Sequence, residues 1–282
     1  MRGFFAVAVI VSFLTGCGGG GGNPPPDPQP QAPNVSGLWR ATYHFTSGAG
    51  LIPDSTLPMV LVPSGNNIYR FVSSDGIAYG NLSATPTTFS TVETVSLAQG
   101  TGVYSATATM TGALTANSLN GGGQYVLALV SGIDTSGLDG FSLDVTFTAT
   151  RQGPVPTGTA SSLIGTWLVQ MHALNPPDGV DPDLSGNITM SLREPNVYDI
   201  TGMDSKNTTK LIVIGTTWYM LNEDELTASG TDYSYQLLMS GTVATNSFTG
   251  GGTLEWTSKD GTDNYGLDGA QVQATFQAAR VN

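Results

Sequence analysis

The eleven residues from Phe141 to Arg151, with the sequence FSLDVTFTATR, decide the fold. Apolar and polar side chains alternate strictly along this stretch, a period of two that predicts a half-buried β-strand. The apolar face carries Phe141, Leu143, Val145 and Phe147, and the opposite face carries Ser142, Asp144, Thr146 and Thr148. By the same alternation Arg151 points inward at the end of the strand.

The stretch belongs to a segment that occurs twice. Met110–Arg151 aligns without a gap on Met239–Arg280, and 17 of the 42 positions are identical. The front ends correspond as well, since Gly37-Leu38-Trp39 matches Gly165-Thr166-Trp167. The pattern indicates a tandem duplication of a unit of ordinary domain size. We expect the units at 35–152 and 163–282, joined by a Pro/Gly-containing linker at 153–162.

Each unit predicts eight short strands and no helix of ten residues or more. In the first unit the expected strands are 37–45, 56–63, 67–73, 76–83, 87–97, 102–115, 119–131 and 140–151. In the second they are 165–174, 185–193, 196–203, 208–214, 216–222, 231–244, 247–258 and 270–280. Short sequential strands joined by tight turns form a meander, and a meander of eight strands closes into a barrel. The expected fold is all-β, with two tandem eight-stranded up-and-down antiparallel barrels. The triplets Gly121–Gly123 and Gly250–Gly252 are expected to mark bends at barrel corners.

The units resemble the lipocalin/calycin superfamily. Gly37-Leu38-Trp39 and Gly165-Thr166-Trp167 match its Gly-x-Trp signature, and an arginine ends the last strand of each unit. The resemblance implies that Arg151 packs over Trp39, and Arg280 over Trp167, to close each barrel floor. The family's helix after the barrel is missing, which leaves the family's ligands open for this chain.

The first residues resemble a bacterial lipoprotein signal. A short positive start and an apolar run precede Leu14-Thr15-Gly16-Cys17, which matches a lipobox. The resemblance implies removal of the signal peptide 1–16 and lipidation of Cys17. Residues 17–34 are rich in Gly and Pro and predict a flexible tether. Because residue 18 is Gly and not Asp, the expected location is the outer membrane, with the protein lipid-anchored on its periplasmic or cell-surface side.

The composition excludes several classes of partner. Only 11% of the 282 residues are charged, against about 25% in an average domain. A formal net charge of −12 argues against nucleic acid as a partner. The single cysteine excludes a disulfide framework and a thiolate metal cluster.

Few residues offer catalytic chemistry. The two histidines, His44 and His172, each stand five residues after a signature tryptophan, and alternation places both on the outer face. Asp144 and Glu255 also alternate outward, so no inward pair of carboxylates is evident. We expect no enzymatic activity, no catalytic residue, no cofactor and no metal.

Acidic residues in loops leave calcium binding as a minor alternative to turn formation. They are Asp178, Asp181 and Asp183, then Asp260, Asp263 and Asp268, and in the first unit Asp134 and Asp139. Glu223-Asp224-Glu225 predicts a solvated turn.

The leading hypothesis is a non-enzymatic lipoprotein that binds a small apolar or amphipathic ligand in one or both barrels. The candidate lining residues are Tyr43, Met59, Tyr125, Leu127, Met171, Met190, Tyr235, Met239 and Trp256. The alternative is a structural or assembly lipoprotein with filled barrels, whose outer surface docks an envelope protein partner. An envelope hydrolase or isomerase would need an inward cluster of titratable groups, and the alternation indicates none.

Overall fold

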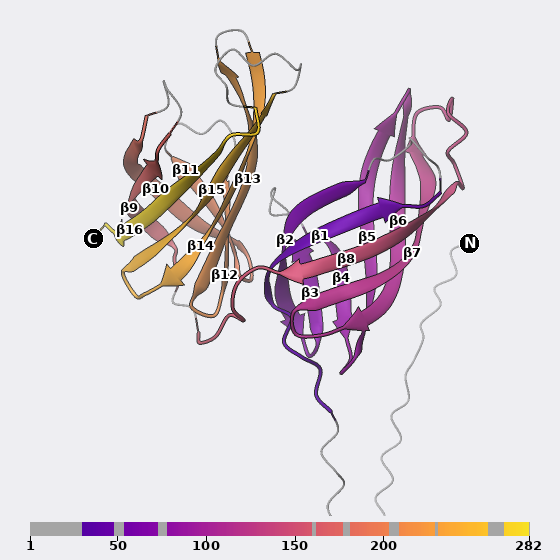
Figure 1. Ribbon diagram of the computed structural model, residues 1–282, viewed down its shortest axis with the longest axis horizontal. Coiled ribbons are helices and arrows are strands. Elements are labelled where there is room, and N and C mark those ends of the chain that lie inside the picture. Colours follow the sequence, from indigo (N-terminus) through magenta and orange to yellow (C-terminus); the bar gives the residue numbers. More distant parts are fainter. Residues whose placement is uncertain are drawn as a thin grey trace, which may run out of the picture. The chain divides into compact units, whose positions relative to one another are not determined.

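The computed structural model describes residues 30–47, 54–72, 78–159, 162–176, 181–202, 209–228, 231–258 and 268–281. These residues contain sixteen strands, which form two closed antiparallel barrels of eight strands each (Figure 1). The fold predicted from the sequence is therefore confirmed. Cys17, its lipobox and the tether up to residue 29 lie outside the described residues.

Barrel one is formed by the first eight strands. They are β1 (Gly37–Phe45), β2 (Ser55–Gly65), β3 (Ile68–Val72), β4 (Ala78–Ala84), β5 (Thr88–Gln99), β6 (Gly102–Leu114), β7 (Ser118–Ser131) and β8 (Ser142–Arg151). Each strand pairs with the next along the chain, and β1 pairs with β8 to close the barrel.

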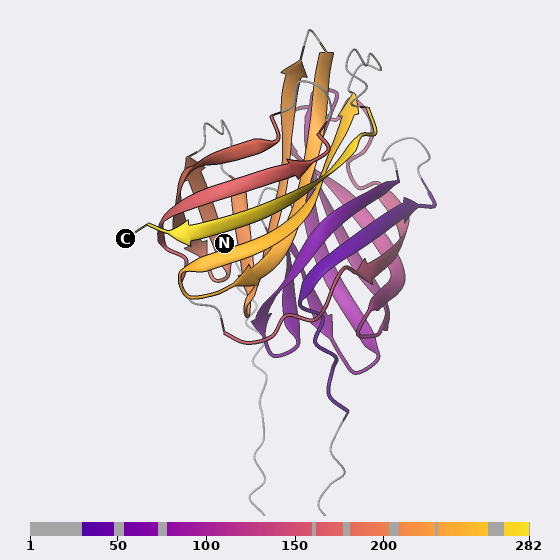
Figure 2. The same ribbon diagram turned by 60° about the vertical axis from the view of Figure 1, so that its left-hand side comes forward.

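Barrel two repeats this order. Its strands are β9 (Gly165–Leu174), β10 (Asp183–Glu194), β11 (Val197–Gly202), β12 (Thr209–Ile214), β13 (Thr217–Ala228), β14 (Thr231–Val243), β15 (Ser247–Ser258) and β16 (Gln271–Arg280). β9 and β16 lie side by side and close this barrel, as the turned view shows (Figure 2).

The strand positions follow the predicted ones to within two residues, with one exception. β13 extends to Ala228, and Glu223, Asp224 and Glu225 pair with Gln236, Tyr235 and Ser234 of β14. The predicted solvated turn at these three residues is therefore wrong. The neighbouring strand β14 supplies the hydrogen-bonding ladder that overrides their weak strand propensity.

The core of each barrel follows the alternation. Along β8, Leu143, Val145, Phe147 and Ala149 are buried, and the residues between them are exposed. Phe141 lies just before β8 and is 37% exposed, so it does not share the buried face as predicted.

Backbone approach explains the glycine triplets. A Cβ at Gly123 would lie 1.9 Å from the carbonyl oxygen of Thr109, and one at Gly252 would lie 1.9 Å from that of Leu238. Any side chain at these positions would force the paired strands apart. The equal distances in the two barrels show that the duplicated units share this local geometry.

Each barrel has a floor of tryptophan and arginine, and the two contacts implied by the resemblance are present. The Arg151 guanidinium carbon lies 4.7 Å from the centre of the Trp39 ring, and that of Arg280 lies 5.2 Å from Trp167. Both pairs occupy the same register, at the start of the first strand and the end of the last. A desolvated guanidinium over an indole ring contributes roughly 1–2 kcal/mol.

The floors differ in how many groups the arginine binds. Arg151 donates to the carbonyl oxygens of Ala116, Ser36 and Asn34 at 2.8, 2.5 and 2.7 Å. Arg280 donates to those of Ser162 and Ile164 at 3.1 and 2.6 Å, and it is more exposed.

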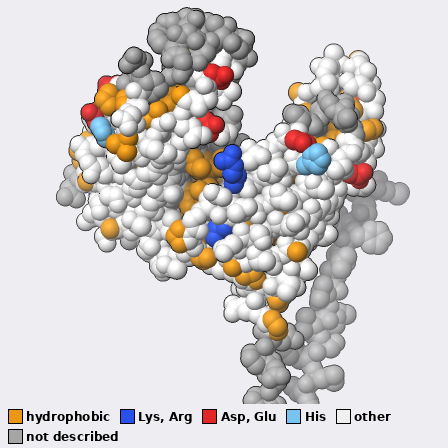
Figure 3. Space-filling view, viewed as in Figure 1, with side chains coloured by type: hydrophobic (Ala, Val, Ile, Leu, Met, Phe, Trp, Pro, Cys, Tyr) orange, Lys and Arg blue, Asp and Glu red, His pale blue; other side chains and the backbone are white. Residues whose placement is uncertain are grey.

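The surface in view is mostly uncharged and polar. White side chains and backbone dominate Figure 3, with scattered acidic and basic groups. Among the described residues, no helix is long and apolar enough to cross a bilayer.

Candidate functional site

A buried carboxyl group lies inside barrel one. The inward face of β5 carries Phe89, Thr91 and Glu93, and the side chains of Thr91 and Glu93 are each only 1% exposed. The expectation that no titratable cluster faces inward is therefore wrong. Since an isolated buried charge is expensive, the surroundings of Glu93 decide what it can do.

Two tyrosine hydroxyls, from strands far apart in the sequence, hydrogen-bond to the Glu93 carboxyl. Tyr43 of β1 donates toward Oε1 and Oε2 at 3.3 and 3.2 Å, and Tyr125 of β7 donates to Oε2 at 3.1 Å. Tyr79 of β4 interacts with Tyr43 and donates to the sulfur of Met59 at 3.8 Å. We call Glu93, Tyr43, Tyr79 and Tyr125 the carboxylate–tyrosine cluster.

These hydrogen bonds leave the carboxylate weakly satisfied. A hydroxyl that donates to a carboxylate normally lies about 2.5–2.7 Å away, shorter than any of the three contacts here. Tyr43 has one hydroxyl hydrogen, so it serves only one of the two oxygens at a time. Glu93 therefore retains capacity to accept from a further donor.

Burial sets the protonation of the cluster. Desolvation raises the pKa of Glu93 to about 7, although the hydrogen bonds from Tyr125 and Tyr43 act to lower it. Burial also raises the pKa of Tyr43 and of Tyr125 above the usual value, and the nearby Glu93 contributes in both cases. Near neutral pH Tyr43 and Tyr125 remain protonated donors, and Glu93 is partly protonated and partly ionised.

Small residues make room around Glu93. Gly80 of β4 pairs with Glu93, and a Cβ there would lie 2.6 Å from Glu93 Cγ. On the other side Glu93 pairs with Ala108 of β6. Among the described buried side-chain atoms, the Thr91 hydroxyl oxygen lacks a hydrogen-bond partner. The interior at this level thus holds polar atoms that the fold itself does not fully satisfy.

Barrel two lacks the cluster at the same positions. Glu93 pairs with Ala108, and 129 residues later Asn222 pairs with Leu237. By the same register Met171 stands for Tyr43 and Leu254 for Tyr125. The duplicated fold therefore forms without the acid or the two tyrosines.

The predicted lining residues separate into groups. In barrel one, Tyr43, Met59 and Tyr125 meet at the cluster, and Leu127 is buried in the same core. In barrel two, Met190 and Met239 are buried in the main core, with Met171 packed against it. Tyr235 and Trp256 belong to another buried cluster with Ala173, Tyr233 and Val272.

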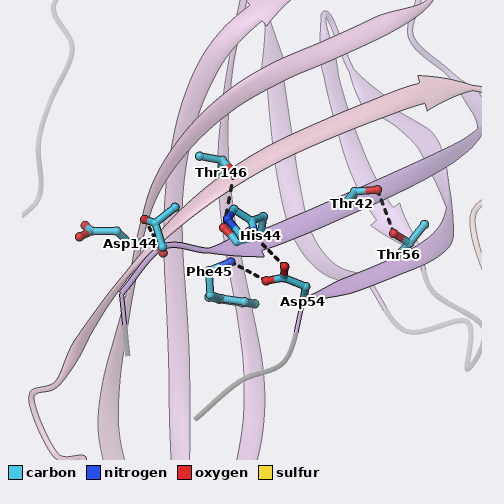
Figure 4. A network of polar contacts seen from close by, with 8 residues as sticks. Thr42, His44, Phe45, Asp54, Thr56, Asp144 and Thr146 are labelled. Carbon is cyan, nitrogen blue, oxygen red and sulfur yellow. Dashed lines mark hydrogen bonds and ion pairs between the residues drawn. The ribbon is translucent and has the colours of Figure 1, made fainter. Parts of the chain in front are cut away.

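The two histidines lie on the outer faces, and each has an acidic partner that the sequence analysis missed. His44 Nδ1 is 2.5 Å from Asp54, and His172 Nδ1 is 2.8 Å from Asp183. Figure 4 shows the first pair beside the Thr42–Thr56 contact, with Asp54 also accepting from the Phe45 amide. Their side chains are 58% and 51% exposed, so solvent weakens both pairs.

His172 and Asp183 also border a hollow of about 540 Å³ on barrel two. Its rim consists largely of exposed polar side chains, including Gln170, Ser185 and Gln277. The hollow therefore lies at the outer face and is open to water.

The described loop aspartates organise turns. Asp134 accepts from the Tyr104 hydroxyl at 2.6 Å and from the amides of Leu138 and Asp139. Asp139 accepts from the Leu129 amide, and Asp268 from that of Ser258. Within the described ranges, no group of three or more His, Cys, Asp or Glu side chains is placed to hold a metal. Asp178, Asp260 and Asp263 lie outside the described residues.

Comparison with known proteins assigns no family. No family model matches the chain, and no curated protein matches its sequence. A protein of unknown function from the DUF3598 family of Nostoc punctiforme is similar in structure at 13% identity. The similarity covers 87% of this chain and 96% of that one, with a TM-score of 0.23.

Kievitone hydratase from Nectria haematococca is also similar, at 13% identity, over 89% of this chain and 91% of that one, with a TM-score of 0.17. At these TM-scores neither protein assigns an activity to this chain.

Proposed function

We propose that this protein is a lipid-anchored, non-enzymatic binding protein of the outer membrane, and that barrel one holds one small amphipathic ligand. The observation that carries the binding proposal is the buried Glu93 with its two long tyrosine hydrogen bonds. Ligand sites orient a largely apolar ligand through a few polar groups, and this is the role that we assign to Glu93 and its tyrosines.

Barrel two supports the proposal as an internal control. Because its fold forms with Asn222, Met171 and Leu254 at the equivalent positions, closing the barrel does not require a buried carboxyl. A buried acid that closure does not require is a candidate for recognition.

We propose that the interior of barrel two is filled by its own side chains. At the positions of Tyr43 and Tyr125 it carries Met171 and Leu254, which pack against its apolar core. Met220 replaces Thr91 at the corresponding position, 129 residues later, and it is buried. We therefore place the ligand in barrel one only.

Binding is favoured over glycoside hydrolysis because the cluster provides one carboxyl group. Among the described acidic residues, Glu93 alone is buried. Glycoside hydrolysis of the two-carboxylate kind needs a second acid facing it.

The binding proposal is tested with the full-length protein and a panel of a fatty acid, a sterol and small aromatic compounds. Calorimetry is expected to detect at least one ligand. The triple variant Glu93→Asn, Tyr43→Met, Tyr125→Leu installs the residues of barrel two and is expected to remain folded while losing that ligand. Met239→Leu, a volume-conserving change in barrel two, is the matched control and should bind normally.

Absence of binding to the whole panel, or equal binding by the triple variant, would overturn this proposal. Specific co-purification of an envelope protein in the absence of any ligand would favour the structural alternative instead.

The anchoring proposal rests on Cys17 and its lipobox and is tested separately. Cells expressing the wild type should incorporate labelled palmitate into the protein and retain it in the outer-membrane fraction. Cys17→Ser should abolish both. Label in the Cys17→Ser protein would contradict lipidation at this residue.

A further inference from the structure

We infer that the ligand of barrel one carries a cationic amine on a compact apolar body, with the ammonium group seated between the Glu93 carboxylate and the rings of Tyr43 and Tyr125. This inference rests on the proposed binding function and specifies the chemical class of the ligand.

The charge of Glu93 favours a cationic ligand. Among the described residues the ion pairs involve other groups, and Glu93 has no cationic partner. The titratable groups that face it are the hydroxyls of Tyr43 and Tyr125, with Tyr79 beside Tyr43. A buried carboxylate is stabilised most by an opposite charge at close range. A cationic ligand would supply the charge partner that Glu93 lacks among the described residues.

The supply of hydrogen-bond acceptors also favours an ammonium group. An ammonium group brings three donors and no acceptor. The Glu93 oxygens have unused acceptor capacity, and the Thr91 hydroxyl oxygen has no partner among the described residues. Thr91 and Glu93 lie two residues apart on the inward face of β5, so their Cα atoms are about 7 Å apart and both side chains face the same interior.

Aromatic side chains surround the carboxyl group. Tyr43 packs against Phe147 at 5.0 Å, Tyr125 against Phe45 at 5.7 Å, and Tyr79 against Phe71 at 5.7 Å, measured between ring centres. Aromatic faces attract cations, and cages of such rings recognise ammonium groups. The same rings offer an apolar surface to the rest of the ligand.

The same features disfavour an anionic ligand. A carboxylate brought to Glu93 would add a like charge in a site of low polarity. An alcohol could donate one hydrogen bond, but it would leave the charge of Glu93 unbalanced.

The test uses three compounds with one body and different heads: phenethylamine, 2-phenylethanol and phenylacetate. Each is titrated calorimetrically into the full-length protein at pH 8. The wild type should bind the amine at least tenfold more tightly than the alcohol and should not bind phenylacetate measurably. Glu93→Gln should bind the amine and the alcohol within about threefold of each other.

Glu255→Gln is the matched control, because Glu255 is exposed on β15 of barrel two. It should retain the preference of the wild type. Circular dichroism and hydrogen exchange in barrel one establish that Glu93→Gln is folded.

Dependence on pH provides a second readout in the unmodified protein. The cationic ligand requires ionised Glu93, while Tyr43 and Tyr125, whose pKa values burial raises, stay protonated below pH 8. Amine affinity should therefore fall at least tenfold between pH 8 and pH 5.5, and alcohol affinity should change little.

Equal binding of amine and alcohol by the wild type, or an amine preference that survives in Glu93→Gln, would overturn the inference. Binding of a fatty acid or sterol without the amine would overturn it as well, while leaving the proposed binding function intact. Absence of binding to any compound would overturn both.

Discussion

The two barrels have the same strand order and the same tryptophan–arginine floor, but their interiors differ further along the strands. Barrel one holds Glu93 and its tyrosines, whereas barrel two has Asn222, Met171 and Leu254 in the same register. The comparison separates what the fold requires from what one copy has in addition. Floor and glycine triplets are common to both and belong to the fold; the buried acid does not.

The largest expected effect concerns the tryptophan–arginine floor, which the two barrels share. Arg151→Ala should lower the free energy of unfolding by about 3–5 kcal/mol, because it removes a ring contact and leaves three carbonyl groups without their charged donor. Arg280→Ala should cost about 1–2 kcal/mol, since Arg280 binds fewer carbonyls and is more exposed. Urea unfolding, with hydrogen exchange to assign each transition to its barrel, measures both. Equal losses would show that the floors are energetically equivalent.

The next effect is a pH dependence of stability that arises from the interior of barrel one. Because the folded-state pKa of Glu93 is raised from 4.5 to about 7, the folded protein holds this proton more tightly than the unfolded chain. Stability should therefore fall as pH rises through this window and remain lower above it, by about 3 kcal/mol in total.

Glu93→Gln should remove that fall. The variant is expected to match the wild type near pH 4.5 and to be more stable at pH 8, in urea unfolding at a series of pH values. Glu255→Gln should titrate like the wild type. If Glu93→Gln is less stable at pH 8, the ionised carboxyl contributes to folding, contrary to the comparison with barrel two.

A smaller effect concerns Thr91, whose hydroxyl has no partner among the described residues and whose place in barrel two is taken by Met220. Thr91→Val keeps the shape and removes the buried oxygen. It should stabilise barrel one by about 1 kcal/mol, as measured by thermal unfolding. Ser90→Ala, on the exposed face of the same strand, should change stability little. Destabilisation by Thr91→Val would indicate that the hydroxyl is satisfied in solution.

The smallest effect is expected at the exposed histidine–aspartate pairs. Hydrogen bonding to His44 and to the Phe45 amide lowers the pKa of Asp54. His44→Ala should raise that pKa toward the usual value, as an NMR titration would show, without a measurable change in unfolding. Asp144, exposed nearby on β8, serves as the reference carboxyl. An unchanged Asp54 pKa would mean that the amide alone sets it.

Much of the fold was predictable because local patterns and the duplication agree. Alternation along 143–151 and its repeat predict which side chains face inward, including Arg151, and the resemblance to lipocalins implies its contact with Trp39. The end of β13 was not predictable in this way, because Glu223-Asp224-Glu225 has weak strand propensity and only the pairing with β14 decides its conformation.

The candidate site was harder to predict than the fold. Tyr43, Met59 and Tyr125 were expected to face inward, but Glu93 was missed. Apolar residues occur on both faces of β5, where Val92 points outward at 53% exposure, so the alternation does not show which face is buried. The aspartate partners of the histidines were missed because a hairpin brings them together across the strand pair.

The position of the tryptophan–arginine floor has a consequence for how such a protein can evolve. Trp39 begins the first strand and Arg151 ends the last, and they are neighbours in the sheet, so the chain enters and leaves barrel one at the same end. The same holds for Trp167 and Arg280 in barrel two. A gene segment encoding one barrel can thus be copied in tandem through a short connection, without disturbing the loops at the opposite end. One copy can then preserve structural integrity while the interior of the other accumulates the substitutions that create a new specificity.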